Sequence, residues 1–231
     1  MITIIPAIMP RNFEDLKQKI ASVIGATDTV QIDFCDGTFS KMITWPFRDG
    51  DTASLKTILD EDEGMPYWQE MNFEFDLIVA DAMEYFDKYI HMGPTRIVFH
   101  ISKNTNTQKF AEFLEGIDPY VKENTKMGIA IEINDSVADF AHIFPHVDFV
   151  QCMGIEHIGF QGQEFDERVI NQIQAVLDAV PDMEISVDGG VSLDTAPYLI
   201  EAGATRLVAG SAIFNSLDPV GTIREMEELG N

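Results

Sequence analysis

Eight short runs rich in β-branched and aromatic residues alternate along this chain with stretches whose apolar residues recur at helical spacing. In the first such stretch the apolar residues are Phe13, Leu16, Ile20 and Val23, which would share one face of a helix. Strict alternation of strands and helices is typical of a parallel sheet with helices packed outside it. The predicted strands are Thr3–Ala7, Val30–Phe34, Phe73–Val79, Arg96–His100, Gly128–Ile133, Asp148–Met153, Glu184–Val187 and Arg206–Ala209.

The number of these units favours a closed barrel over an open sheet. Eight strand–helix units in 231 residues suit a barrel, which typically takes ~200–250 residues. No Gly-x-Gly-x-x-Gly motif follows the first strand, so the sequence does not indicate a dinucleotide-binding sheet. Helix starts are indicated by Asn12, by Asp135 and by Asp218 before Pro219. We interpret residues 1–231 as one domain, with a long loop and a short helix in segment 38–64.

The charge balance excludes several classes of function. Lysine and arginine number 15 against 39 aspartates and glutamates, which gives a formal net charge of −24. Nucleic acids and anionic membranes attract basic surfaces, so neither is expected as a partner. The chain has only two cysteines, Cys35 and Cys152, and its amino terminus lacks the basic segment of a signal peptide. We therefore expect a cytoplasmic protein without disulfides.

Carboxylates interrupt three otherwise apolar strands near their ends. Asp33, Asp76 and Asp188 lie within the runs Val-Gln-Ile-Asp-Phe, Phe-Glu-Phe-Asp-Leu-Ile-Val and Ile-Ser-Val-Asp-Gly-Gly. The working residues of such barrels project from the carboxyl ends of the strands, so the three side chains are expected to meet there. Each alone is explained equally well as a hydrogen-bonded strand end, but three like charges at one point need a cation. A divalent metal site is therefore the hypothesis, with His100 as a hydrogen-bonding residue beside it.

Glycines gather in the loops that would follow the sixth, seventh and eighth strands. The segments are Gly159-Phe160-Gln161-Gly162-Gln163, Asp188-Gly189-Gly190-Val191 and Ala209-Gly210-Ser211, and a short helix is expected to open at Ser211. Backbone N–H groups at such a place bind an anion without lysine or arginine. Tight turns alone would also explain the glycines, but their presence in both of the last two loops favours a phosphate cradle.

The sequence resembles the ribulose-phosphate 3-epimerase family over nearly its whole length. The resemblance is carried by Ile5-Pro6-Ala7-Ile8-Met9 with Asn12-Phe13, by Ile32-Asp33-Phe34-Cys35-Asp36-Gly37-Thr38-Phe39, by the two glycine segments 159–165 and 187–191, and by Val208-Ala209-Gly210-Ser211-Ala212-Ile213-Phe214. It implies an α/β fold, a single-domain (β/α)8 TIM barrel of the ribulose-phosphate-binding type.

The resemblance also implies a chemistry. In that family two aspartates exchange protons with C3 of the sugar from opposite faces while a metal stabilises the enediolate, and the matching residues are Asp33 and Asp188. The family's metal site includes two histidines, whose positions here are Gln31 and Asp76. Asp33, Asp76, Asp188 and Gln31 would thus form an all-oxygen ligand set, which suits Mg²⁺ or Mn²⁺ better than zinc. The phosphate would bind at Gly159, Phe160, Gln161, Gly162, Gly189, Gly190, Gly210 and Ser211.

The sequence is compatible with three different functions. The first is a metal-dependent 3-epimerase of ribulose 5-phosphate, xylulose 5-phosphate or a similar ketose phosphate, as in the pentose phosphate pathway. The second is a catalytically impaired barrel that only binds a phosphosugar, for which the two replaced histidines argue. The third, a related phosphosugar lyase, is disfavoured because such enzymes typically carry Asp-x-Lys-x-x-Asp on the third strand, where this chain has no lysine. A small phosphorylated ketose and other copies of the chain are the expected partners.

Overall fold

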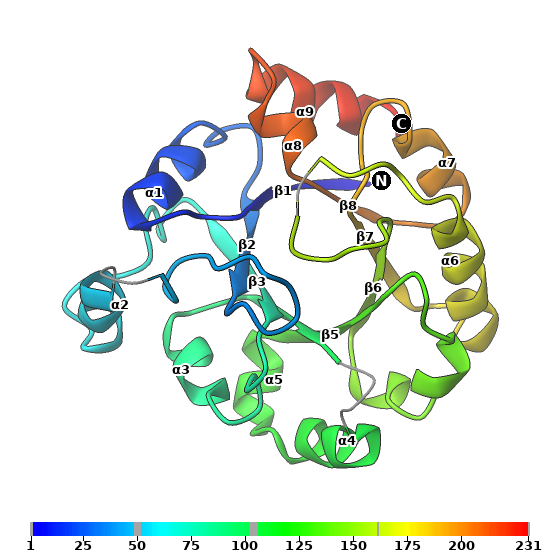
Figure 1. The fold of residues 1–231 in the computed structure, drawn as a ribbon, viewed down its shortest axis with the longest axis horizontal. Coiled ribbons are helices and arrows are strands. Elements are labelled where there is room, and N and C mark those ends of the chain that lie inside the picture. Colours follow the sequence, from blue (N-terminus) through cyan, green and yellow to red (C-terminus); the bar gives the residue numbers. More distant parts are fainter. Residues whose placement is uncertain (1, 49–51, 102–105, 161, 231) are drawn as a thin grey trace.

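Eight parallel strands close into a barrel in their sequence order, with β8 hydrogen-bonded to β1 (Figure 1). This computed structural model describes residues 2–48, 52–101, 106–160 and 162–230. The strands are β1 (Thr3–Ile8), β2 (Thr29–Cys35), β3 (Asn72–Ile78), β4 (Arg96–His100), β5 (Lys126–Ile131), β6 (Phe149–Met153), β7 (Glu184–Asp188) and β8 (Arg206–Ala209). All eight predicted strands form, with ends displaced by two residues or fewer. The predicted TIM-barrel fold is confirmed.

Helices surround the barrel on its outer side (Figure 1). They are α1 (Phe13–Ala21), α2 (Thr52–Leu59), α3 (Phe86–His91), α4 (Thr107–Gly116), α5 (Pro119–Asn124), α6 (Arg168–Ala179), α7 (Ala196–Glu201), α8 (Ser211–Phe214) and α9 (Pro219–Glu228). The predicted caps form at two of them, because the side chain of Asn12 accepts from the backbone N–H of Asp15 and that of Asp218 from Gly221.

One predicted helix takes a different form. After β5 the chain makes two short 3₁₀ turns, η1 (Val137–Phe140) and η2 (Phe144–His146), instead of an α-helix. Pro145 lies within the second turn, where it supplies no backbone N–H and restricts the residue before it. The N-cap of the first turn is Ser136, and the Asp135 carboxylate accepts from the backbone N–H of Glu132 and so stabilises the loop itself. The barrel wall at β5 and β6 is therefore covered by 3₁₀ turns and by neighbouring helices.

The two-residue period of the strands separates the barrel interior from its helix-covered outside. On β2, Ile32 and Phe34 belong to the large hydrophobic cluster under the helices, so the alternate residues Gln31, Asp33 and Cys35 face inward. The interior contains a second apolar cluster, in which Phe149 is the largest side chain. A Cβ atom at Gly128 on the neighbouring strand would lie 2.3 Å from the ring of Phe149, so this glycine makes room for it.

Ion pairs fill the barrel at the amino ends of the strands. Glu74 is fully buried and accepts from Arg96 Nε at 2.6 Å and from Arg206 Nη2 at 2.9 Å. Glu184 pairs with the same Arg96 and lies 3.6 Å from Lys126 Nζ. The Arg96 guanidinium also lies 3.8 Å above the centre of the Phe149 ring. Positive and negative groups are thus matched at this end of the barrel, which is far from the glycine loops.

Substituting Glu74→Leu is expected to lower the free energy of unfolding by about 3–5 kcal/mol, because both guanidinium groups would stay buried without this partner. Urea unfolding followed by circular dichroism measures the change. The exposed substitution Glu115→Leu on α4 serves as the control and is expected to change stability by less than about 0.5 kcal/mol. A loss at Glu74 as small as that of the control would show that the ion pairs do not stabilise the barrel.

Candidate active site

Three aspartates meet at the carboxyl ends of their strands, as predicted. Asp33, Asp76 and Asp188 each place a carboxylate oxygen within 4.8 Å of the others. Asp33 and Asp76 lie opposite each other in the register of β2 and β3, whereas Asp188 reaches the cluster from β7, across β1 and β8. Asp76 is fully buried, and Asp33 nearly so. The fold therefore brings together carboxylates that lie up to 155 residues apart in the sequence, the separation of Asp33 from Asp188.

Gln31 lies next to this cluster on the inward face of β2. Its Nε2 donates to Asp33 Oδ1 at 2.9 Å and to Asp188 Oδ2 at 2.9 Å. The Gln31 side chain is fully buried, so these two bonds form out of contact with solvent. The amide therefore links two acids that belong to non-neighbouring strands.

His100 stands beside the third carboxylate. Its Nε2 lies 2.9 Å from Asp76 Oδ1, and both side chains are almost completely buried. Burial opposes the charge on this imidazole, but the neighbouring Asp76 carboxylate outweighs burial and raises the pKa of His100. The sequence led us to expect a hydrogen-bonding His100 beside the site, and the structure places its imidazole next to Asp76. A protonated His100 offsets one of the three negative charges.

The other two aspartates hold protons more tightly than ordinary carboxyl groups. Burial, together with the charge of Asp76, raises the pKa of Asp188 to about 7. Burial and the charges of Asp188 and Asp76 raise the pKa of Asp33 well above its usual value. Hydrogen bonds from Gln31 act in the opposite direction on both groups. Near neutral pH, one carboxyl of such a pair can hold a proton while the other is ionised.

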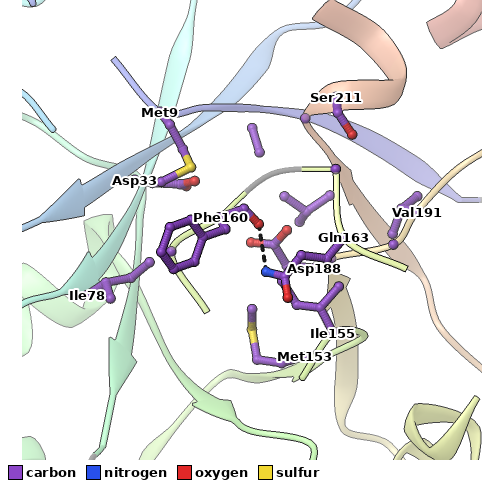
Figure 2. A pocket seen from close by; sticks show the side chains of 17 residues that line it. Met9, Asp33, Ile78, Met153, Ile155, Phe160, Gln163, Asp188, Val191 and Ser211 are labelled. Atoms are coloured by element: carbon purple, nitrogen blue, oxygen red, sulfur yellow. Dashed lines mark hydrogen bonds between the residues drawn. The ribbon is translucent and has the colours of Figure 1, made fainter. Parts of the chain in front are cut away.

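A cavity opens over the two aspartates and extends into the glycine loops (Figure 2). Asp33 and Asp188 reach it from β2 and β7, and Met9, Ile78 and Met153 give it an apolar side. Its lining includes these predicted binding residues: Gly159, Phe160, Gly162, Gly189, Gly190, Gly210 and Ser211. Gln161 was also predicted and lies outside the described residues. Gln31 and Asp76 do not line this cavity; they contact its aspartates from within the barrel.

Two glycines at the end of β7 adopt backbone conformations that other residues rarely take. Gly189 has φ +94° and Gly190 has φ +69°. A Cβ atom at Gly190 would lie 2.8 Å from the backbone Cα of Phe165, and Thr195 Oγ1 donates to the Gly190 carbonyl at 2.8 Å. This turn is fixed from both sides, and only glycine fits it without strain.

Sequence reasoning missed several residues of the cavity. Met9 and Ile155 line it, but nothing in the pattern around them separates them from ordinary core residues. Gln163 was noted only as part of the loop; its Nε2 donates to the carbonyl of Phe160 at 3.0 Å and to that of His157, and so it ties the loop together (Figure 2). A polar side chain directly after Gly162 in the glycine loop was the available signal.

The barrel has an acid cluster at the carboxyl ends of its strands and glycine-rich loops after β7 and β8. This combination is typical of TIM barrels that bind phosphorylated ligands. The model of the ribulose-phosphate 3-epimerase family matches residues 3–214, and the chain belongs to this family. The ribulose-phosphate 3-epimerase of Bacillus subtilis is 27% identical over 233 residues, covering 98% of each chain. That of Eremothecium gossypii is 25% identical over 228 residues, covering 97% of this chain and 91% of its own.

Solved structures share the fold at lower sequence identity. KGPDC from Streptococcus mutans superposes with a TM-score of 0.70 at 11% identity, covering 99% of this chain and 97% of its own. The 3-hexulose-6-phosphate synthase of Salmonella typhimurium superposes with a TM-score of 0.66 at 15% identity, covering 99% and 98%. Among the described residues, no helix has the length and apolar character needed to cross a bilayer.

The predicted phosphate cradle is tested by Gly190→Ala. We expect binding of inorganic phosphate to weaken by at least about tenfold, or 1.4 kcal/mol, because an added methyl group forces the turn away from Phe165. Isothermal titration calorimetry measures the change. Gly93→Ala is the matched control, because Gly93 also has a positive φ (+78°) but no atoms within 4 Å of an added Cβ. Equal phosphate affinity in both variants would exclude the cradle at Gly190.

Proposed function

We propose that this chain is a metal-dependent sugar-phosphate 3-epimerase that interconverts ribulose 5-phosphate and xylulose 5-phosphate, or a ketose phosphate of similar size. The observation that carries this proposal is the pairing of Asp33 and Asp188 beneath one cavity, each with a raised pKa. Family membership and the printed names of the curated relatives support it. The cavity lining, as far as it is described, contains no lysine or arginine that would serve a different phosphosugar chemistry.

Inversion at C3 requires a base on one face of the sugar and an acid on the other. The hydrogen on C3 lies next to the C2 carbonyl, so its removal leaves an enediolate that a proton can reach from either side. In our proposal one aspartate, ionised, takes the C3 proton, and the other, protonated, delivers a proton to the opposite face. The raised pKa values of both groups, about 7 for Asp188, suit these tasks, because each aspartate alternates between acid and base in the two directions of the reaction.

The acid cluster also fits a divalent metal ion. Three carboxylate oxygens lie within 4.8 Å of one another, and Oδ2 of the buried Asp76 has no hydrogen-bond partner among the described residues. Asp33, Asp76 and Asp188 would hold the ion, and oxygen ligands favour Mg²⁺ or Mn²⁺ over zinc. When bound, such an ion supplies Lewis-acid polarisation of the sugar oxygens, which makes the C3 hydrogen more acidic. His100 contacts Asp76 and limits its rotation.

The phosphate of the substrate would lie at the glycine loops after β7 and β8. Gly189, Gly190, Gly210 and Ser211 line the same cavity as the two aspartates, so one substrate can reach both groups. Backbone N–H groups would bind the phosphate, which is compatible with the strongly acidic chain.

Self-association of the chain stays a prediction. We keep the cytoplasm as its compartment, because Cys35 and Cys152 are free and buried.

A barrel that binds a phosphosugar without turnover remains the alternative that the sequence suggested. Two acids that share a buried amide donor argue against it, because burial of ionisable groups is costly and a binding protein gains nothing from it. A lyase is not supported, since β3 contains no lysine.

Exchange of the C3 hydrogen with deuterium from solvent tests the proposed reaction. The wild-type chain is expected to exchange it in ribulose 5-phosphate or another ketose phosphate, and Asp188→Asn should slow the exchange by about 10²–10⁴-fold, because an amide cannot carry the proton. Proton NMR follows the exchange. Asp182→Asn, at an exposed aspartate just before β7, is the control and should exchange like wild type. No exchange by the wild type with any ketopentose or ketohexose phosphate, across several metals, would exclude the reaction.

Removal of metal tests the acid cluster. Treatment with a chelator is expected to abolish exchange, with Mg²⁺ or Mn²⁺ restoring it better than zinc. Asp76→Asn should weaken Mn²⁺ binding by at least about tenfold, because the amide that replaces the carboxylate is neutral. Electron paramagnetic resonance of free Mn²⁺ gives the affinity, with Asp182→Asn again as the control. Full activity in metal-free protein would contradict the metal site.

A further inference from the structure

Gln31 has an unusual place among the groups of the site. It is a fully buried amide whose single nitrogen donates to both proton-transferring aspartates, Asp33 at 2.9 Å and Asp188 at 2.9 Å. An amide nitrogen has two hydrogens, and each is used on one carboxyl. Its Oε1 is buried without a hydrogen-bond partner among the described residues. All of the recorded hydrogen bonding of this side chain is therefore directed at the two acids.

This arrangement determines where the acidic proton can be. An amide N–H only donates, so the oxygens facing Gln31, Asp33 Oδ1 and Asp188 Oδ2, must be acceptors. The carbonyl oxygen of a carboxyl group accepts a hydrogen bond better than its O–H oxygen does, so the protonated aspartate favours its hydrogen on the other oxygen, Asp33 Oδ2 or Asp188 Oδ1. Both residues line the cavity, so the remaining oxygen of each carboxyl is the one available to a substrate.

The amide is also suited to a reaction that runs in both directions. Because Gln31 has no charge to gain or lose, it makes the same two bonds whether Asp33 or Asp188 holds the proton. A carboxylate at this position would add a fourth negative charge to the cluster, and an ammonium group would pair strongly with one acid at the expense of the other.

We propose that Gln31 is a positioning residue that holds Asp33 and Asp188 in fixed orientations through its two N–H groups and leaves the second oxygen of each for proton transfer. This role rests on the proposed function and differs from the ligand role that the sequence suggested for Gln31. A metal ligand would act through Oε1, whereas Nε2 is the atom that faces the two aspartates. The two roles therefore differ in which amide atom faces the aspartates.

Two nearly isosteric substitutions separate these roles. Gln31→Met removes both the N–H groups and the oxygen, whereas Gln31→Glu keeps oxygen ligands, removes the N–H groups and adds a carboxyl group to the cluster. If Gln31 positions the acids, both variants should lower kcat by about 10- to 100-fold with KM changed by less than about threefold. Gln151→Met is the matched control, because Gln151 is equally buried in the barrel but its Nε2 contacts Met153 Sδ, at 3.9 Å. Its kcat should stay within about threefold of wild type.

Two kinetic outcomes would overturn this role. If Gln31→Glu retains kcat and binds Mn²⁺ at least as tightly as wild type while Gln31→Met loses both, Gln31 acts as a ligand. If Gln31→Met retains kcat, Gln31 is a packing residue. Thermal melting shows whether the Gln31 variants stay folded to the same degree as Gln151→Met.

A spectroscopic measurement tests the same role without turnover, so it remains decisive if the proposed function fails. In protein labelled with ¹⁵N in glutamine side chains, the Gln31 NH₂ signals are assigned by their loss in Gln31→Met. We expect both protons to resist exchange with D₂O, one to shift in Asp33→Asn and the other in Asp188→Asn, and the resistance to persist with Mg²⁺. NH₂ protons that exchange freely or do not respond to either substitution would overturn the role. Absence of C3 exchange by the wild type, by contrast, would overturn the proposed function alone.

Discussion

Repulsion among three carboxylates, two of them buried and one half-buried, is the constraint around which the carboxyl end of this barrel is built. Asp33, Asp76 and Asp188 lie within 4.8 Å of one another at a place from which water is largely excluded. Carboxylates at such distances cannot all stay ionised without compensation. The chain supplies two kinds: an imidazole against Asp76, and the Gln31 amide between the other two. The rest of the charge is relieved by the raised pKa values of Asp33 and Asp188, which is the property that proton transfer needs.

Buried charges are paired with opposite charges at one end of the barrel and lie beside like charges at the other end. At the amino ends of the strands, Glu74 is placed between Arg96 and Arg206, so that positive and negative groups are paired directly. At the carboxyl ends the acids face one another, and the cavity above them offers no basic side chain among its described lining residues. A matched network resists change and suits a structural role, whereas an unmatched cluster is ready to bind a cation or exchange a proton. Stability and function are thus separated along the barrel axis.

Sequence reasoning predicted the fold well because the signals it uses are local. Strand runs, caps such as Asn12 and the positions of glycines depend on neighbouring residues, and the barrel follows from their number and order. The prediction was wrong after β5, where apolar spacing indicated a helix but the chain around Pro145 forms 3₁₀ turns. The convergence of Asp33, Asp76 and Asp188 was also predictable, because parallel strands of a barrel bring their carboxyl ends together.

What the sequence did not reveal was the direction of side-chain atoms. The sequence shows a glutamine at position 31, but it does not show whether the amide oxygen would bind a metal or the amide nitrogen would bind carboxylates. Only the distances from Nε2 to Asp33 and Asp188 distinguish them. In the same way, Met9 and Ile155 contribute to the cavity through long-range packing that leaves no local pattern. Position along a strand is therefore readable from sequence, but the hydrogen-bond partners chosen across the barrel are not.

The net charge of −24 affects how an anionic ligand would reach this site. A phosphorylated sugar is an anion, and neither the surface of this chain nor the described lining of the cavity attracts it through basic side chains. The recognition by backbone N–H groups that we propose is short-ranged and depends on the fixed turn at Gly189 and Gly190 rather than on long-range attraction. Such a site selects its ligand by shape without electrostatic steering. Because the chain and the ligand are both negative, association should be slower than in a basic cleft and should become faster as salt screens the repulsion.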